Sequence, residues 1–377
     1  ALTSLKCFGG NYVVHDRWSL NYLDLSQNTS LDTLICYGNK LTNLNVSNCS
    51  SLKVLNCADN PLTSLDISNN TQLKEITIGA NGDQGSIDGI NYSSGDISGT
   101  WGSSNYLLST LDVTNNTQLE IIRISYHPIK NIDLSQNYNL KSFMGDQLET
   151  IDVTNNPNLV TLLAWGYNSN SIMSSIDLSQ NTNLKLLQLS YFPLQNIDIS
   201  NLSNLERLGL YYLSIDSVDL SQNTLLESVG IQNNPNLSSL DFRNNPNLVS
   251  AWIKGNNKLN HLDLRNVDYL NFTNTAELNG NPDLSCVSVD DTAWANANWH
   301  LYLQQGAVFS NDCDAFISSN SGPKTYIPDD NFEAYLETRG MGDGIAYNDS
   351  VFTSNINTVD SLIVNSQNIS DLTGIQD

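Results

Sequence analysis

Residue types that could do chemistry are present, but none stands at a spacing that a catalytic mechanism requires. The 377-residue sequence has four histidines, and no pair of them has the spacing of a zinc-binding HExxH motif. No GxSxG turn, no phosphate-binding P-loop and no GxGxxG before a helix occurs. Carboxylates are plentiful, but they recur at regular intervals, which favours a structural role over a single acid–base pair. The sequence therefore predicts a protein that is not an enzyme and needs no cofactor.

One series of aspartates recurs with a spacing of mostly 21 or 22 residues, and Asn45 takes the equivalent place between Asp24 and Asp66. The series consists of Asp24, Asp66, Asp112, Asp133, Asp152, Asp177, Asp198, Asp219, Asp241 and Asp263. Two interpretations are open. The carboxylates accept hydrogen bonds from hydroxyls and backbone amides on a solvated face, or they collect Ca²⁺, which prefers oxygen ligands. The Asp343–Gly344 and Asn348–Asp349 segments are a weaker calcium candidate, because they lack DxDxDG spacing.

Aromatic side chains follow the strand-like segments in the middle of the sequence, where earlier repeats carry residues such as Asn56 and Thr77. The candidate binding residues are Arg123, Tyr126, Trp165, Tyr167, Gln188, Tyr191, Tyr211, Tyr212 and Trp252. An aromatic cluster in adjacent repeats forms an apolar patch, and such patches usually mark contact sites. Flat aromatic faces suit sugar rings as well as protein side chains. The alternative is that aromatic pairs across neighbouring strands only stabilise the sheet.

These residues are positioned by a repeat with two halves. One half is LDLSxN, as in Leu23–Asn28, and the other is LxxLxLxxNxL, as in Leu31–Leu41. The alternating apolar residues predict a short strand with inward side chains, and the asparagine predicts a turn whose amide bonds neighbouring coils. Stacked coils then form a parallel-stranded solenoid. Cys7, Cys36 and Cys57 occupy inward positions and are expected to be buried free thiols, because adjacent parallel strands seldom give disulfide geometry.

The LxxLxLxxNxL units resemble leucine-rich repeats over roughly residues 2–270, and the nested second half resembles the 21-residue bacterial repeats called IRREKO. The segment IPDDNFEAYL followed by NISDLTGI (residues 327–336 and 368–375) is similar to the N-terminal cap of leucine-rich arrays in secreted surface proteins of marine Bacteroidetes. This resemblance implies an extracellular location on a bacterial cell surface.

The repeat pattern fades after Leu264. An open solenoid end must be covered, so the next segment predicts a C-terminal cap closed by a Cys286–Cys313 disulfide, which requires an oxidising compartment. The expected fold class is mostly β: a leucine-rich-repeat solenoid with short parallel strands on two faces, this cap, and the helical N-cap of a following array. The expected organisation is residues 1–270 as solenoid with insertions at about 79–107 and 166–174, 271–317 as cap, 318–327 as linker, and 328–377 as N-terminal cap and first repeat of a second array.

The charge excludes several classes of partner. Asp and Glu number 39 against 16 Lys and Arg, so the formal net charge is -23 at pH 7. Nucleic acids and anionic lipid surfaces require basic patches, and no run reaches the ~18 apolar residues of a membrane span. The resemblance to secreted surface proteins, with which this composition agrees, implies a non-enzymatic extracellular recognition or adhesion module, one segment of a long tandem-repeat surface protein. Its expected partner is a glycan or a surface protein bound by the aromatic residues.

The two ends of the sequence favour an alternative. Residues 371–377 stop within a repeat and residues 1–7 start within one, so joining them restores a normal period. The chain would then be one super-period of a tandem protein, or a structural filament or stalk subunit that self-associates head to tail through open solenoid ends. An arbitrarily trimmed fragment would give the same pattern. A third class, the accessory region of an enzyme, also stays open.

Overall fold

The computed structural model describes most of the solenoid and the segments that follow it. The described residues are 1–8, 19–79, 107–166, 171–267, 276–299, 303, 306–313, 324–342, 349–357, 359, 361–365 and 367–375. Nearly all of the first predicted insertion, the middle of the second and most of the predicted linker lie outside this set.

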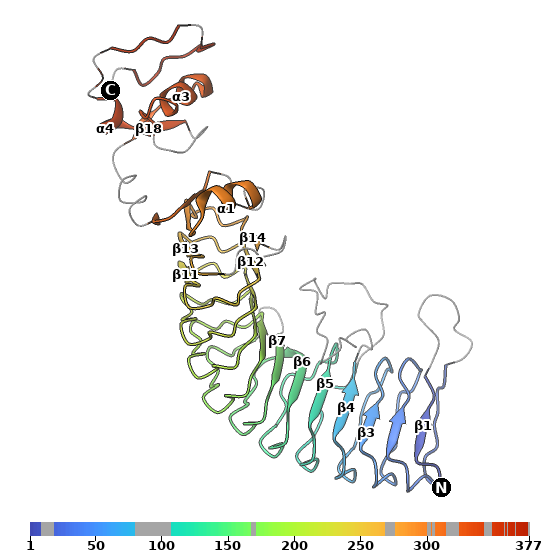
Figure 1. The fold of residues 1–377 in the computed structure, drawn as a ribbon. Coiled ribbons are helices and arrows are strands. Elements are labelled where there is room, and N and C mark those ends of the chain that lie inside the picture. The colour runs from blue at the N-terminus through green and yellow to red at the C-terminus, as the bar shows by residue number, and fades with distance from the viewer. Residues whose placement is uncertain are drawn as a thin grey trace.

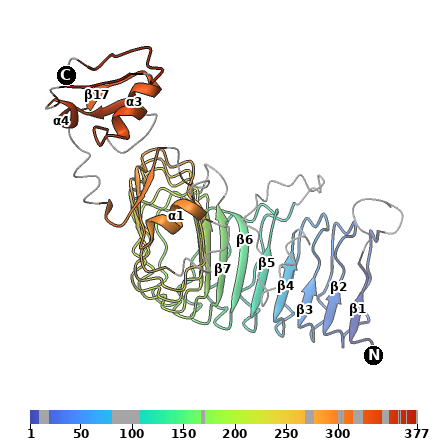
Figure 2. The same ribbon diagram turned by 45° about the horizontal axis from the view of Figure 1, so that its top comes forward.

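Short strands from successive coils form a 12-stranded parallel sheet on the inner side of a curved stack (Figure 1). In Figure 2 the later coils are seen nearly end-on and lie over one another. The strands of this sheet are β1 (Ser4–Lys6), β2 (Thr33–Ile35), β3 (Val54–Asn56), β4 (Glu75–Ile78), β5 (Ile121–Ile124), β6 (Ser142–Leu148), β7 (Thr161–Gly166), β8 (Leu186–Ser190), β9 (Arg207–Tyr211), β10 (Ser228–Gln232), β12 (Ser250–Lys254) and β14 (Ala276–Glu277).

The inward side chains of this sheet form the core of the solenoid. Each strand pairs in register with the next, so that equivalent residues stack in a column of Leu34, Leu55, Ile76, Ile122, Phe143, Leu162, Leu187, Leu208, Val229 and Ala251. None of them is more than 3% exposed. Burying a large apolar side chain contributes about 1.5–3 kcal/mol relative to leaving it in water, so the column holds neighbouring coils together.

The opposite side of the coils forms strands near the C-terminal end of the solenoid. There β11 (Ser239–Asp241), β13 (His261–Asp263), β15 (Cys286–Ser288) and β16 (Val308–Ser310) make a four-stranded parallel sheet on the outer side of the curve (Figure 1). Hydrogen-bonded strands lie about 4.8 Å apart, whereas a curved stack spreads the outer sides of its coils. The predicted mostly β solenoid is confirmed, with its outer ladder shorter than its inner one.

Asparagine side chains form hydrogen bonds between neighbouring coils at two corners of the coil, as the repeat predicts. Nδ2 of Asn60 donates to the carbonyls of Cys36 and Cys57 at 2.9 and 3.1 Å, and its Oδ1 accepts the N–H of Leu41 at 3.1 Å. At the second corner, Nδ2 of Asn116 donates to two carbonyls of the preceding coil at 3.0 and 2.9 Å. The same donation is made by Asn70, Asn137, Asn156, Asn181, Asn223 and Asn245.

The aspartate series forms one turn per coil. Oδ1 of Asp198 accepts the N–H of Ser200 at 3.0 Å and its hydroxyl at 2.7 Å, and Asn45 makes the same two bonds with Ser47. The backbone bond recurs at Asp24, Asp66, Asp112, Asp133, Asp152, Asp177, Asp219, Asp241 and Asp263. The Ser200 hydroxyl and amide lower the pKa of the Asp198 carboxyl, because they stabilise its charged form. This geometry supports the structural interpretation of the series.

A disulfide between Cys286 and Cys313 closes the C-terminal cap, as predicted, with the two Cα atoms 5.7 Å apart. Helix α1 (Thr292–Asn298) lies between the two cysteines in sequence, and the Asp291 side chain caps its first turn by accepting the N–H of Trp294. Trp299 is 4% exposed and joins the solenoid core. The cap therefore covers the end of the hydrophobic column.

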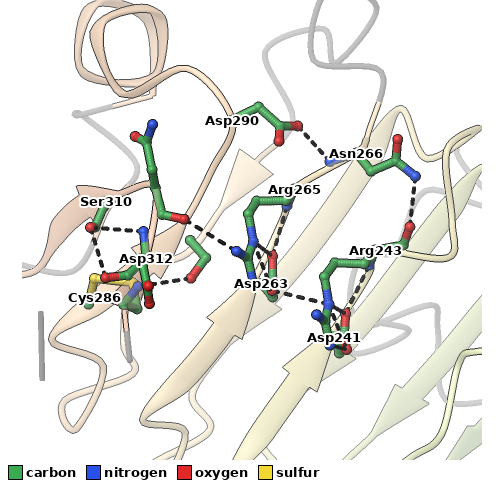
Figure 3. Close-up of polar contacts among 12 residues, drawn as sticks. Asp241, Arg243, Asp263, Arg265, Asn266, Cys286, Asp290, Ser310 and Asp312 are labelled. Carbon is green, nitrogen blue, oxygen red and sulfur yellow. Dashed lines mark hydrogen bonds and ion pairs between the residues drawn. A yellow bond between two sulfur atoms is a disulfide. The ribbon is translucent and has the colours of Figure 1, made fainter. Parts of the chain in front are cut away.

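A buried carboxylate ties the last coils to the cap (Figure 3). Asp263 is 1% exposed, and its oxygens accept the Nε–H of Arg265 at 3.0 Å and lie 3.3 Å from Nε of Arg243. The Arg265 guanidinium also donates to the carbonyl of Asn311 in the cap at 3.3 Å. The residue two places after the aspartate is Ser or Thr in the preceding coils and Arg in these two.

A second, smaller core lies beyond the cap. Strands β17 (Lys324–Tyr326) and β18 (Ser350–Phe352) pair antiparallel, and helices α3 (Asp330–Glu337) and α4 (Thr353–Ile356) complete the unit. Its buried residues are Ile327, Phe332, Tyr335, Leu336 and Val351. Oδ1 of Asp329 caps α3, and its Oδ2 accepts the N–H and hydroxyl of Ser370 at 2.7 Å each. The repeat-like segment is thereby fastened to the helix.

Candidate binding face of the sheet

Outward side chains of the central strands form a small apolar cluster. Met144, Leu163 and Leu186 come from β6, β7 and β8 and are only 4%, 1% and 7% exposed. Met144 and Leu163 are register partners on adjacent strands. Trp165 packs against the three and is half-buried. The three side chains are therefore buried, and the partly exposed residue packed against them is aromatic.

Arg123 borders the cluster on β5, where it pairs in register with Met144. Its Nη1 lies 2.8 Å from Oε1 of Glu75 and 3.5 Å from the hydroxyl of Thr77, and the Arg123 side chain is 17% exposed. The guanidinium is thus already engaged in an ion pair. It gives this edge of the sheet no net positive charge.

The Tyr211 ring lies across two neighbouring strands. A Cβ atom added at Gly209 would lie 2.7 Å from Cε2 of Tyr211, and one added at Gly230 would lie 2.0 Å from its hydroxyl oxygen. Neither glycine has a positive φ, so space for the ring, and not backbone conformation, requires glycine at both places. Burial raises the pKa of the Tyr211 hydroxyl to about 12, and the phenol stays neutral at physiological pH.

Gln188 and Trp252 flank these glycines in the same row of the sheet. The register places Gln188, Gly209, Gly230 and Trp252 side by side on β8, β9, β10 and β12. Strand neighbours lie about 4.8 Å apart, so about 14 Å of backbone separates the two flanking strands. We call this part of the face, in which the Tyr211 ring lies over the two glycines between Gln188 and Trp252, the glycine trough.

Three tyrosines lie just beyond the strand ends in left-handed backbone conformations. Their φ angles are 62° at Tyr126, 61° at Tyr191 and 54° at Tyr212, whereas the equivalent places of other coils hold residues such as Gly38 and Gly255. This conformation costs a residue with a side chain roughly 1–2 kcal/mol. The rings of Tyr191 and Tyr212 stack 4.5 Å apart at 9° and are 37% and 49% exposed. Backbone preference therefore does not explain tyrosine at these positions.

The structure divides the predicted binding residues into three groups. These are the ion-paired Arg123, the sheet-face residues Trp165, Gln188, Tyr211 and Trp252, and the rim residues Tyr126, Tyr191 and Tyr212. Tyr167 lies outside the described residues.

Sequence reasoning missed the apolar cluster and the two glycines. Consecutive apolar residues occur within Ser142–Met144, Thr161–Trp165 and Lys185–Leu189. In a strand that is buried on one face only, apolar and polar residues alternate. Consecutive apolar residues at Phe143–Met144 and Leu162–Leu163 were a usable signal for an outward apolar cluster. Glycine inside a strand, as at Gly209 and Gly230, often marks close approach of another group.

Acidic groups give one arrangement that could hold a cation. Among the described residues, only Asp330, Glu333 and Asp349 bring three ligand atoms within 4.8 Å of one another. Glu333 is fully buried, and its Oε2 accepts the N–H of Asp349 at 3.0 Å. Asp349 belongs to the calcium candidate predicted from sequence, whereas residues 343–348 lie outside the described part of the chain.

Comparisons with known proteins bear on the fold. No protein-family model matches the sequence, and no curated protein matches it. The functional domain of InlJ from Listeria monocytogenes, whose structure includes a cysteine ladder, is 28% identical with a TM-score of 0.56. The match covers 78% of this chain and 60% of the InlJ chain. The chain folds as a leucine-rich-repeat solenoid. An internalin, InlF from the same organism, is 18% identical with a TM-score of 0.41 over 63% of this chain and 75% of its own.

This chain also stacks cysteines. Cys36 and Cys57 occupy adjacent inward places on successive coils and are buried free thiols, as predicted. Cys7 takes the same place one coil earlier, but it is only half-buried. Cys49 is a fourth buried free thiol. Within the described residues, no helix has the length and apolar character needed to cross a membrane.

Proposed function

We propose that this chain is a non-enzymatic recognition and adhesion module that works outside the cell, on a bacterial surface. The observation that carries the proposal is the aromatic surface on the inner sheet, made by Trp165, Tyr211 and Trp252 on successive parts of one curved face. A concave sheet presents such residues from many coils to one partner, which is how solenoids form extended binding surfaces.

Three further features support this proposal. The likeness to the functional domain of InlJ supports an interaction module of the leucine-rich-repeat class. The Cys286–Cys313 disulfide suits an oxidising compartment outside the cytoplasm. The stacked and exposed rings of Tyr191 and Tyr212 at the rim also supply an aromatic contact surface.

Adhesion of coated particles tests the proposal. Beads carrying the full chain are incubated with a panel of bacterial and animal cell surfaces, and bound beads are counted. We expect adhesion to at least one surface and its loss in Trp165→Ala, which removes the exposed aromatic member of the apolar cluster. The matched control is Tyr138→Ala, because Tyr138 is 50% exposed and lies outside the inner sheet. Equal adhesion by both variants would contradict recognition through the inner face.

A further inference from the structure

The glycine trough is the place on the inner face where the sheet lacks side chains of its own. In the same row, the earlier strands carry side chains such as Thr77, Arg123 and Leu163, and the row resumes at Trp252. Among the described strands of this row, which begins with Lys6 on β1, only β9 and β10 present glycine there. Two adjacent strands therefore leave room for the Tyr211 ring against the sheet.

The Tyr211 ring lies over both glycines and presents an aromatic surface there. Because both edges of its ring approach the glycine positions, with Cε2 over Gly209 and Cε1 and the hydroxyl over Gly230, the ring spans the two strands. The Tyr211 side chain is half-buried, so part of the ring is accessible. The aromatic face carries the negative part of the ring quadrupole, and it attracts weakly positive groups such as the C–H bonds of a sugar ring.

A carboxamide beside the Tyr211 ring supplies polar contacts. The Gln188 side chain approaches Gly209, because its Cγ would lie 2.9 Å from a Cβ placed there. Its carboxamide offers both a donor and an acceptor, which matches the hydroxyls of a sugar. The nearby cations are Arg207, two residues before Gly209 on β9, and Lys254, which lies 3.7 Å from Glu277. With a chain charge of -23, the site disfavours an anionic ligand.

The same face is less suited to a protein partner. Protein interfaces depend on anchor residues that fill apolar pockets, and they bury about 800 Å² on each side. Here the large apolar residues Met144, Leu163 and Leu186 are already covered, at 7% exposure or less. What remains partly exposed in the glycine trough is the aromatic ring of Tyr211 with the Gln188 amide beside it, and this combination suits a sugar ring.

We propose that the glycine trough binds an uncharged sugar ring of a glycan, stacked on Tyr211 and hydrogen-bonded by Gln188. This inference rests on the recognition role proposed above and names its ligand class. Trp252 closes the far side of the trough and limits how the ring is placed. The stacked rings of Tyr191 and Tyr212 lie beyond the ends of the same strands.

A glycan array probed with the full chain tests this site. The probes are neutral oligosaccharides of glucose, mannose, galactose and N-acetylglucosamine, beside sialylated and uronic-acid oligosaccharides. We expect binding to at least one neutral probe. Tyr211→Ala removes the aromatic ring, and Gly230→Ala displaces it, so each should weaken that binding at least about tenfold. Tyr138→Ala should leave it unchanged, and Tyr211→Phe should keep most of it, because the ring is retained.

Several results would overturn the sugar site. They are no binding to any neutral probe, binding to acidic probes alone, or full binding by Tyr211→Ala. Thermal unfolding of each variant is measured first, and if Gly230→Ala does not fold, Tyr211→Ala and Tyr211→Phe decide. The bead assay separates the two proposals. Adhesion that needs Trp165, survives periodate oxidation of glycans and is abolished by protease treatment of the target cells would keep the recognition role and reject the sugar ligand.

Discussion

Nδ1 of His127 accepts the backbone N–H of Leu108 at 3.2 Å. This bond takes the place of the one that Oδ1 of Asn60 makes with Leu41 in an earlier coil at 3.1 Å. A neutral imidazole can accept a hydrogen bond through one nitrogen, whereas a protonated imidazole has two donors and no acceptor. His127 therefore substitutes for the repeat asparagine only while it is uncharged. Burial lowers its pKa from 6.5 to about 4, in keeping with that requirement.

Stability should fall as the pH decreases from 6.5 to about 4. In this window the unfolded chain protonates His127 while the folded chain does not, so the unfolded state binds more protons and is stabilised relative to the folded state. The full effect of this shift is roughly 3 kcal/mol. Urea denaturation at pH 7.5 and 4.5 measures it. His127→Asn keeps the acceptor and should flatten the pH dependence, and an equal slope in both proteins would contradict this role.

Replacing Asp198 should separate the turn from its charge. Asp198→Asn keeps the acceptor oxygen, as Asn45 does naturally with Ser47, so we expect stability at pH 7 close to that of wild type. Asp198→Ala leaves the Ser200 amide without this acceptor and should lower the stability measurably more than Asp198→Asn does. Urea denaturation of the two variants checks this. Equal destabilisation by both substitutions would mean that the charge, and not the turn, is what matters.

Removing the Asp263 carboxylate should loosen the C-terminal cap. Asp263→Ala leaves Arg243 and Arg265 without their shared buried partner, and we expect a loss of about 2 kcal/mol, less than for a fully buried pair because both arginines are partly exposed. Hydrogen exchange should speed up in β13 and β15. The matched control is Asp241→Ala, whose side chain is 44% exposed and whose loss should cost less. Equal exchange rates in the two variants would refute this account.

The four free thiols should react in an order set by burial. Burial raises the pKa of Cys36 to about 12 and the pKa of Cys57 well above its usual value, so neither forms the reactive thiolate at pH 8. Cys7 is only half-buried and should react first with Ellman's reagent in the native protein. Denaturant should release the remaining three. Cys7→Ser should abolish the fast phase, and a fast phase that persists in this variant would place an accessible thiol elsewhere.

The sequence by itself was enough to predict the solenoid, because its information is local and repeated. Each inward position, as at Leu34 and Leu55, is one residue of a periodic pattern, and the next coil repeats it about 21 residues later. The asparagine corners and the cap disulfide follow from the same regularity and from where it stops. The same pattern recurs in successive coils, so a departure from it in one coil does not obscure the fold.

Tertiary structure alone decided what the outward residues do. Tyr211 lies in a space left by glycines on its own strand and the next, and Arg123 is held by Glu75, 48 residues earlier in the chain. Tyr191 and Tyr212 meet each other at the rim because their backbones turn into the left-handed region. The contacts of outward side chains are set by residues on adjacent coils and not by the repeat pattern. Their contacts therefore depend on strand register and curvature, which a list of residues along one coil does not contain.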